Sequence, residues 1–134
     1  MANQGVYDRK TYYIDGATLG SVKAGTIVSQ STVNDNAATV GTLGALNLIG
    51  VTIEDTDLNG MAGVRLCGVV MVTVGAGNLT RGQRVKSDAS GHAVVFTPAA
   101  AGAGVLKGTL GIVNASALAG NAVEVLIDLS NMFE

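Results

Sequence analysis

The chain has 134 residues, of which 13% are charged, and its formal net charge at pH 7 is −2. This length suits one domain with its own core, but ordinary soluble domains carry about 25% charged residues. An acidic balance without a basic patch argues against a nucleic-acid partner, and no run of about 18 apolar residues is present that could cross a membrane. The shortage of charge indicates that part of the surface is covered by other proteins.

The first nineteen residues stand apart from the rest of the chain because they lie outside the repeat described below. They contain four residues of types that are favoured at protein interfaces, Tyr7, Arg9, Tyr12 and Tyr13, together with Lys10. We therefore predict an extended N-terminal arm over residues 1–19 that docks on another protein. A merely frayed terminus is the alternative.

Residues 20–134 are predicted to form a single domain that contains an internal repeat, with units at about 20–74 and 77–130. The landmarks keep their order at a nearly constant offset of about 60 residues. They are three pairs: Gly25 with Gly82, Gly50 with Gly111, and Val64 with Val123. Two copies are too few for a solenoid, so the repeat predicts one compact body that is built from two similar halves.

Hydrophobic alternation with a period of two residues dominates this domain and predicts strands. The expected strands cover 26–29, 37–40, 47–53, 64–74, 84–87, 92–96, 108–114 and 122–130. Turn-forming pairs such as Asn59-Gly60 and Ser90-Gly91 separate them. The sequence therefore predicts an all-β fold, a small barrel or sandwich made from two similar tandem halves.

The predicted strand over 64–74 differs from the others because both of its faces are apolar. Val70 and Val72 belong to one face, whereas Cys67, Val69 and Met71 belong to the other. A strand at the surface of a small β domain normally has one polar face. We therefore predict that Cys67, Val69 and Met71 contact another subunit; a loop of the same chain that covers this face is the alternative.

Several motifs suggest chemistry but lack an essential part. The stretch "DTDLNG" (55–60) begins like a calcium loop, but the twelfth position, which requires a Glu, is Leu66. "GAGVLKGT" (102–109) resembles a phosphate-binding loop with Lys107 and Gly108 in inverted order. The single cysteine and the single His92 cannot make a zinc site. We therefore predict no enzymatic activity, no cofactor and no bound metal.

Six segments give an order of elements that occurs twice: "KAGTIVS", "LIGVTIED" and "GVRLCGVV", then "TRGQRVKSD", "LGIVNAS" and "AVEVLIDL". This duplicated pattern in a Gly- and Val-rich chain with little charge resembles the small capsid decoration, or cement, proteins of tailed bacteriophages. Some members of that family carry a recombinase label. Strand exchange needs a working phosphate loop and a basic DNA path, and this chain has neither.

The resemblance implies a β-barrel body, a homotrimer, and binding to the outer surface of the capsid, where the protein would stabilise contacts between major capsid subunits. It also implies synthesis in the host cytoplasm and a final location on the virion. A β-barrel module of a phage or bacterium that binds a glycan or a small molecule is the alternative. Such a module usually offers aromatic platforms, and the repeat region contains few aromatic residues.

Overall fold

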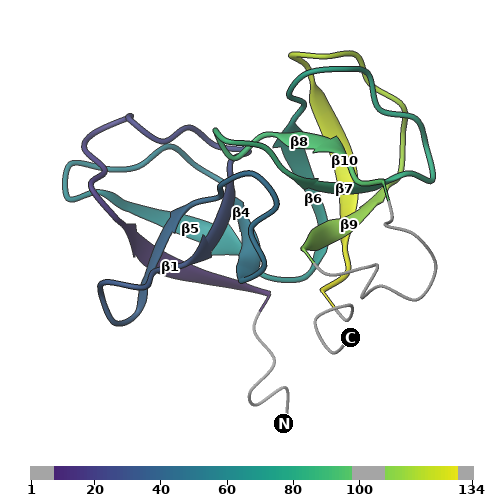
Figure 1. Ribbon diagram of the computed structural model, residues 1–134. Coiled ribbons are helices and arrows are strands. Elements are labelled where there is room, and N and C mark those ends of the chain that lie inside the picture. Colours follow the sequence, from purple (N-terminus) through teal and green to yellow (C-terminus); the bar gives the residue numbers. More distant parts are fainter. Residues whose placement is uncertain (1–7, 98–107, 130–134) are drawn as a thin grey trace, which may run out of the picture.

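The computed structural model of the protein describes residues 8–97 and 108–129, and this part of the chain is built from strands and turns (Figure 1). Its ten strands confirm the all-β prediction, and most of those in the repeat region lie close to their expected positions. They are β1 (Arg9–Ile14), β2 (Ile27–Gln30), β3 (Ala37–Val40), β4 (Leu48–Thr52), β5 (Met61–Arg65), β6 (Gly68–Thr73), β7 (Arg84–Ser87), β8 (Ala93–Val95), β9 (Thr109–Val113) and β10 (Ala122–Ile127).

The strands form two bodies that lie side by side in Figure 1. The first is a closed barrel in the order β1-β3-β2-β4-β5, and the second is a five-stranded sheet in the order β6-β10-β9-β7-β8. In the barrel, β1 runs antiparallel to β5 and parallel to β3. In the second sheet, β6 runs antiparallel to β10, and a parallel bridge joins Val74 to Ala93. The five strands of each body are therefore connected in the same way, with β1 equivalent to β6 and β5 equivalent to β10.

Local irregularities repeat between the two bodies. The register shifts between Val28 and Ser29 in β2, and again between Val85 and Lys86 in β7. A Cβ on Gly50 would lie 2.0 Å from the carbonyl oxygen of Arg65, and a Cβ on Gly111 would lie 2.0 Å from that of Leu126. Because no side chain fits at such a distance, each body needs a glycine at this position.

The structure corrects the predicted N-terminal arm. Residues Arg9–Ile14 form β1, which lies inside the barrel and pairs with β5 from Arg9 opposite Arg65 to Tyr13 opposite Met61. Ile14 is fully buried. The arm prediction is therefore wrong for residues 9–14, whereas residues 1–7 lie outside the described part of the chain. Three consecutive polar residues at its start, Arg9, Lys10 and Thr11, gave β1 the appearance of a docking segment, but they are exposed positions of a barrel strand.

The predicted strand over 64–74 is two strands, and the first repeat unit ends earlier than expected. Gly68 has a φ of +84° and separates β5 from β6. Glycine adopts this left-handed conformation without a steric penalty, so the chain turns there. β6 is the first strand of the second body rather than the last strand of the first. The boundary between the units therefore lies near Cys67, and not between residues 74 and 77.

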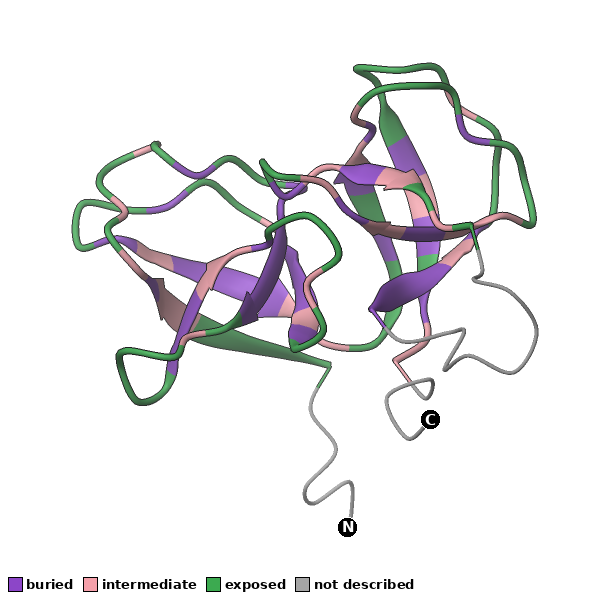
Figure 2. Cartoon of the chain, in the orientation of Figure 1, coloured by how far each residue is buried: buried purple, intermediate pink, exposed green. Residues whose placement is uncertain are grey.

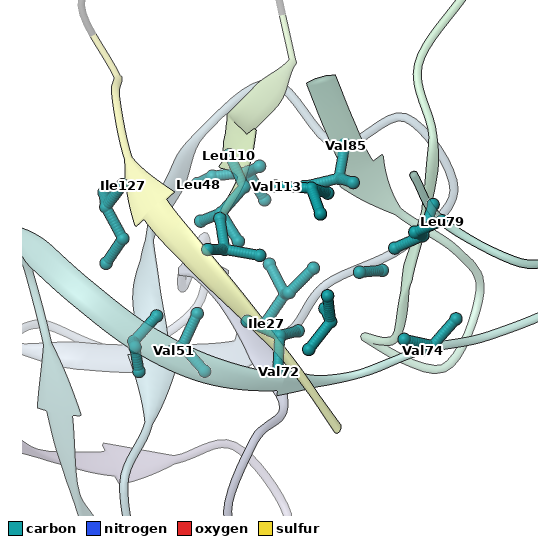
Figure 3. Packing of buried hydrophobic residues seen from close by; sticks show 14 residues of the cluster. Ile27, Leu48, Val51, Val72, Val74, Leu79, Val85, Leu110, Val113 and Ile127 are labelled. Atoms are coloured by element: carbon teal, nitrogen blue, oxygen red, sulfur yellow. The ribbon is translucent and has the colours of Figure 1, made fainter. Parts of the chain in front are cut away.

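The described residues contain two core clusters, and buried residues lie on the strands of both bodies (Figure 2). The smaller fills the barrel and includes Ile14, Val28 and Val64. The larger fills the concave side of the second sheet, yet it also contains Ile27, Leu48 and Val51, which come from the outer face of β2 and β4. Figure 3 shows these three side chains among those of the second sheet. The barrel therefore covers the second sheet and completes its core.

Candidate protein-interaction surfaces

An open groove with a volume of about 410 Å³ runs between the barrel and the second sheet. We call it the inter-body groove. β4 and β5 with the adjoining chain provide one wall, and β6 and β10 provide the other. The side chains that decide its chemistry are Ile53, Arg65, Val69, Met71 and Glu124. It is therefore mainly apolar, with one basic and one acidic group.

The outward side of β6 and β10 exposes apolar side chains next to this groove. Val69 lies opposite Leu126, and the two are 43% and 41% exposed. Met71 lies opposite Glu124 and is 53% exposed. Directly opposed pairs on a sheet are in contact distance, so Val69 and Leu126 form one continuous apolar strip. At the equivalent place on the barrel, Arg9 lies opposite Arg65, so the two bodies differ in charge there.

Arg65 is held at the edge of the groove by an ion pair. Its Nη1 lies 3.7 Å from Oδ2 of Asp8, and the side chain of Asp8 is 64% exposed. A pair as exposed as this contributes little to stability. The side chain of Arg65 is 31% exposed, so it can still contact a partner that approaches the groove.

A second, more polar pocket of about 550 Å³ opens on the barrel at the end of β1 that is close to the β2–β3 turn. We call it the mouth pocket. Its lining includes Lys10, Tyr12, Gln30, Asn36 and Ile49. Lys10 Nζ lies 5.0 Å from the centroid of the Tyr12 ring, a cation–π arrangement. Tyr12 also packs against the barrel core, so the ring is held in place from both sides.

The turn beside the mouth pocket is ordered by its own side chains. Ser31 Oγ donates a hydrogen bond of 2.6 Å to Oδ2 of Asp15, and Asn34 Nδ2 donates one of 2.9 Å to Oδ1 of the same carboxylate. Asn36 has a φ of +54°. Asn tolerates the left-handed region better than most residues, so it can close the turn at this point. The rim of the mouth pocket is therefore pre-organised.

The structure separates the residues that the sequence singled out for an interface. Val69 and Met71 line the inter-body groove, and Cys67 is exposed in the connection between β5 and β6. Lys10 and Tyr12 belong to the mouth pocket instead. Arg9 is exposed on β1. Tyr13 is half-buried, and its Oη accepts a hydrogen bond of 3.3 Å from the Gly16 N–H. Tyr7 lies outside the described residues.

Sequence reasoning missed Arg65 and Leu126 as members of these surfaces. The sequence predicted a strand over 122–130 that includes Leu126, but it did not show which residue of another strand would lie beside Leu126. That information comes from the pairing of β10 with β6. A match between the exposed positions of two strands becomes visible only when their register is known.

The acidic turn that begins like a calcium loop uses its carboxylates to bind the backbone. Asp57 Oδ1 accepts hydrogen bonds of 2.9 Å from the N–H groups of Asn59 and Met61. Asp55 Oδ1 accepts one of 2.8 Å from Ala24, and Glu54 Oε2 accepts one of 2.8 Å from Gly63. These carboxylates therefore point to three different places. Over residues 8–97 and 108–129 no group of three or more His, Cys, Asp or Glu side chains could hold a metal ion.

No protein-family model and no curated protein matches the sequence. A solved structure does match the whole architecture. It is the crystal structure of the N base of head fiber gp8.5 in bacteriophage phi29, with a TM-score of 0.63 over 90% of this chain and 93% of that chain. The two chains share one fold. Their sequences are 17% identical, so the likeness concerns the arrangement of strands and not individual side chains. In the described part of the chain, no helix is long and apolar enough to span a bilayer.

Proposed function

We propose that this protein is a structural component of a tailed-phage virion that binds the outer surface of the capsid and stabilises contacts between major capsid subunits. The observation that carries the proposal is the fold, which nine-tenths of this chain shares with the base of a phage head fiber. The resemblance of the duplicated sequence pattern to capsid decoration proteins is a second, independent reason. It supports the outer surface of the capsid as the place of binding.

The inter-body groove and the apolar strip beside it are the surface that we assign to the capsid contact. Val69, Met71 and Leu126 expose apolar area that a partner would remove from water. Arg65 and Glu124 line the same groove and offer one charge of each sign. An apolar centre with a few charged groups at its edge is the usual composition of a protein interface.

Self-association is part of the proposal. A homotrimer would bring three copies of the groove to one site on the capsid, and contacts that follow the first would be intramolecular. Small contacts that are individually weak would then hold the particle together. The protein would be made in the host cytoplasm and would remain on the virion surface.

Co-sedimentation with empty capsids, assembled from the major capsid protein of the same phage, tests the proposal. We expect the wild-type protein to pellet with the capsids. Met71→Lys should weaken binding by about tenfold or more, because a charge placed in an apolar contact costs roughly 1–3 kcal/mol. Leu58→Lys is the matched control, since Leu58 is 78% exposed and lies outside the groove. Wild-type protein that stays in the supernatant at all concentrations would contradict the proposal.

A further inference from the structure

The contact between the barrel and the second sheet involves two distinct surfaces. The barrel contributes the outer face of β2 and β4, where Ile27 and Val51 project into the core of the second sheet. The second sheet contributes its open end, where the N–H of Thr73 donates to Gly25 with a distance of 3.0 Å and the carbonyl of Gly91 accepts from Ile27 at 2.7 Å. The outer face of the barrel therefore packs against the open end of the second sheet.

Because the two bodies have the same topology, each of these surfaces has a counterpart in the other body. The open end of the second sheet is formed around Val70, Val72, Ser87, Gly91 and Leu110. The equivalent positions on the barrel are Lys10, Tyr12, Gln30, Asn36 and Ile49, which are the lining of the mouth pocket. The backbone supports this equivalence, since Gly91 and Asn36 both have positive φ, at +78° and +54°. The mouth pocket is thus the place where a further body of this fold, from another chain, would pack on the barrel.

The counterpart of the barrel's outer face lies on the second sheet. Arg84 is equivalent to Ile27 and Ile112 to Val51, because Arg84 lies opposite Ile112 in the same way that Ile27 lies opposite Val51. Both residues are partly exposed and project away from the core. They continue in register to Leu126 and then Val69. We call this the outward row: Arg84, Ile112, Leu126 and Val69.

We propose that the outward row of one copy, at Arg84 and Ile112, seats on the mouth pocket of a second copy and repeats the contact that the two bodies make within one chain. This inference rests on the self-association in the proposed function. A closed trimer needs such a head-to-tail interface, in which each chain contributes two different surfaces. Within residues 8–97 and 108–129, one surface of each kind has no other body packed on it.

Each of the two surfaces carries polar and charged groups that could contact the other. The mouth pocket carries Asp35, Lys10 and several side-chain amides, whereas the outward row begins with Arg84. The Nη1 atom of Arg84 lies 3.5 Å from Oδ2 of Asp128, yet it is buried without a hydrogen-bond partner. In the repeated contact, the N–H of Arg84 would donate to the carbonyl of Asn36 of the second copy, as the N–H of Ile27 does to Gly91 within the chain.

Paired variants test the inference by sedimentation velocity at tens of micromolar. Ile112→Asp removes the outer face and leaves the mouth pocket intact. The double variant Gln30→Arg with Asp35→Arg changes two exposed residues of the mouth pocket and leaves the outer face intact. Leu58→Asp is the control for an added charge outside both surfaces. Val95→Asp is a second outer-face variant, because Val95 is 40% exposed and equivalent to Val40, which contacts the turn at Gly91.

We expect the wild type and the control to be oligomeric and each surface variant to be monomeric, with self-association weakened by about tenfold or more. A mixture of an outer-face variant with the mouth-pocket variant should restore a dimer of one copy each, because one intact contact remains between them. Circular dichroism must show that the variants are folded. Variants that stay oligomeric, a mixture that stays monomeric, or a monomeric wild type each overturn the inference. Capsid co-sedimentation is measured as a separate experiment. A wild-type protein that is monomeric and still binds capsids would refute the head-to-tail contact but not the proposed capsid binding.

Discussion

Replacing Ile14 by alanine tests whether β1 is part of the fold or a separate arm. Ile14 is 0% exposed and belongs to the core cluster of the barrel. Truncation of a buried Ile to Ala removes apolar contacts and leaves a cavity, at a cost of about 2–5 kcal/mol. For a chain of this size, 1 kcal/mol shifts the melting temperature by about 3–5 °C. We therefore expect the melting temperature of Ile14→Ala to fall by about 10 °C.

The matched control is Leu58→Ala, which removes a similar aliphatic side chain from a position that is 78% exposed. It should change the free energy of unfolding by about 0.5 kcal/mol or less. Both variants can be compared by differential scanning calorimetry at one pH. Deletion of residues 1–18 should cause a larger loss than Ile14→Ala, since it removes the whole of β1. If Ile14→Ala and the deletion both melt within about 2 °C of the wild type, β1 does not stabilise the barrel and the assignment is wrong.

Two further predictions concern the glycines of β4 and β9 and the acidic turn. Gly50→Ala and Gly111→Ala should each destabilise the protein by about 1–3 kcal/mol or more in urea unfolding, because the new Cβ would meet a backbone carbonyl that cannot move aside. If either variant unfolds at the same urea concentration as the wild type within error, the strands are farther apart than described. Treatment with EDTA should leave the melting temperature unchanged, because Glu54, Asp55 and Asp57 already bind backbone N–H groups; a loss of several degrees that calcium restores would identify a metal site in this turn.

Much of the fold follows from local pattern. The alternation of Val123, Val125 and Ile127 predicted β10, and each of these side chains is buried. The duplicated Gly50 and Gly111 motif predicted two similar halves, and both glycines lie at the same close approach of two strands. These features can be predicted from the sequence because each involves only one or two neighbouring strands. Strand periodicity is a property of one strand, and a glycine marks a place where two strands approach closely.

The limits of the repeat could not be predicted from the sequence, and the reason is physical. β1 carries Arg9, Lys10 and Thr11 on exposed positions, so it lacks the apolar alternation that marks its counterpart β6. The two strands share a place in the topology but not a pattern of side chains. The Val-rich stretch on both sides of Gly68 then read as one strand, because a change of direction at a single glycine leaves the alternation almost unbroken.

The candidate site was predictable in part. Alternation placed Val69 and Met71 on an outward face, and the structure confirms that both are exposed. It could not show that Ile27 and Val51 are buried by the second sheet, because their neighbours there belong to a separate body that follows later in the chain. Surfaces that arise from the packing of two bodies depend on this long-range arrangement.

Electron cryo-microscopy of capsids after incubation with the purified protein tests the central claim most directly. The proposal predicts added density on the outer capsid surface into which the two-body fold fits, with Val69 and Met71 turned toward the major capsid protein. Reconstructions of treated and untreated capsids that are identical at saturating protein concentration would contradict it.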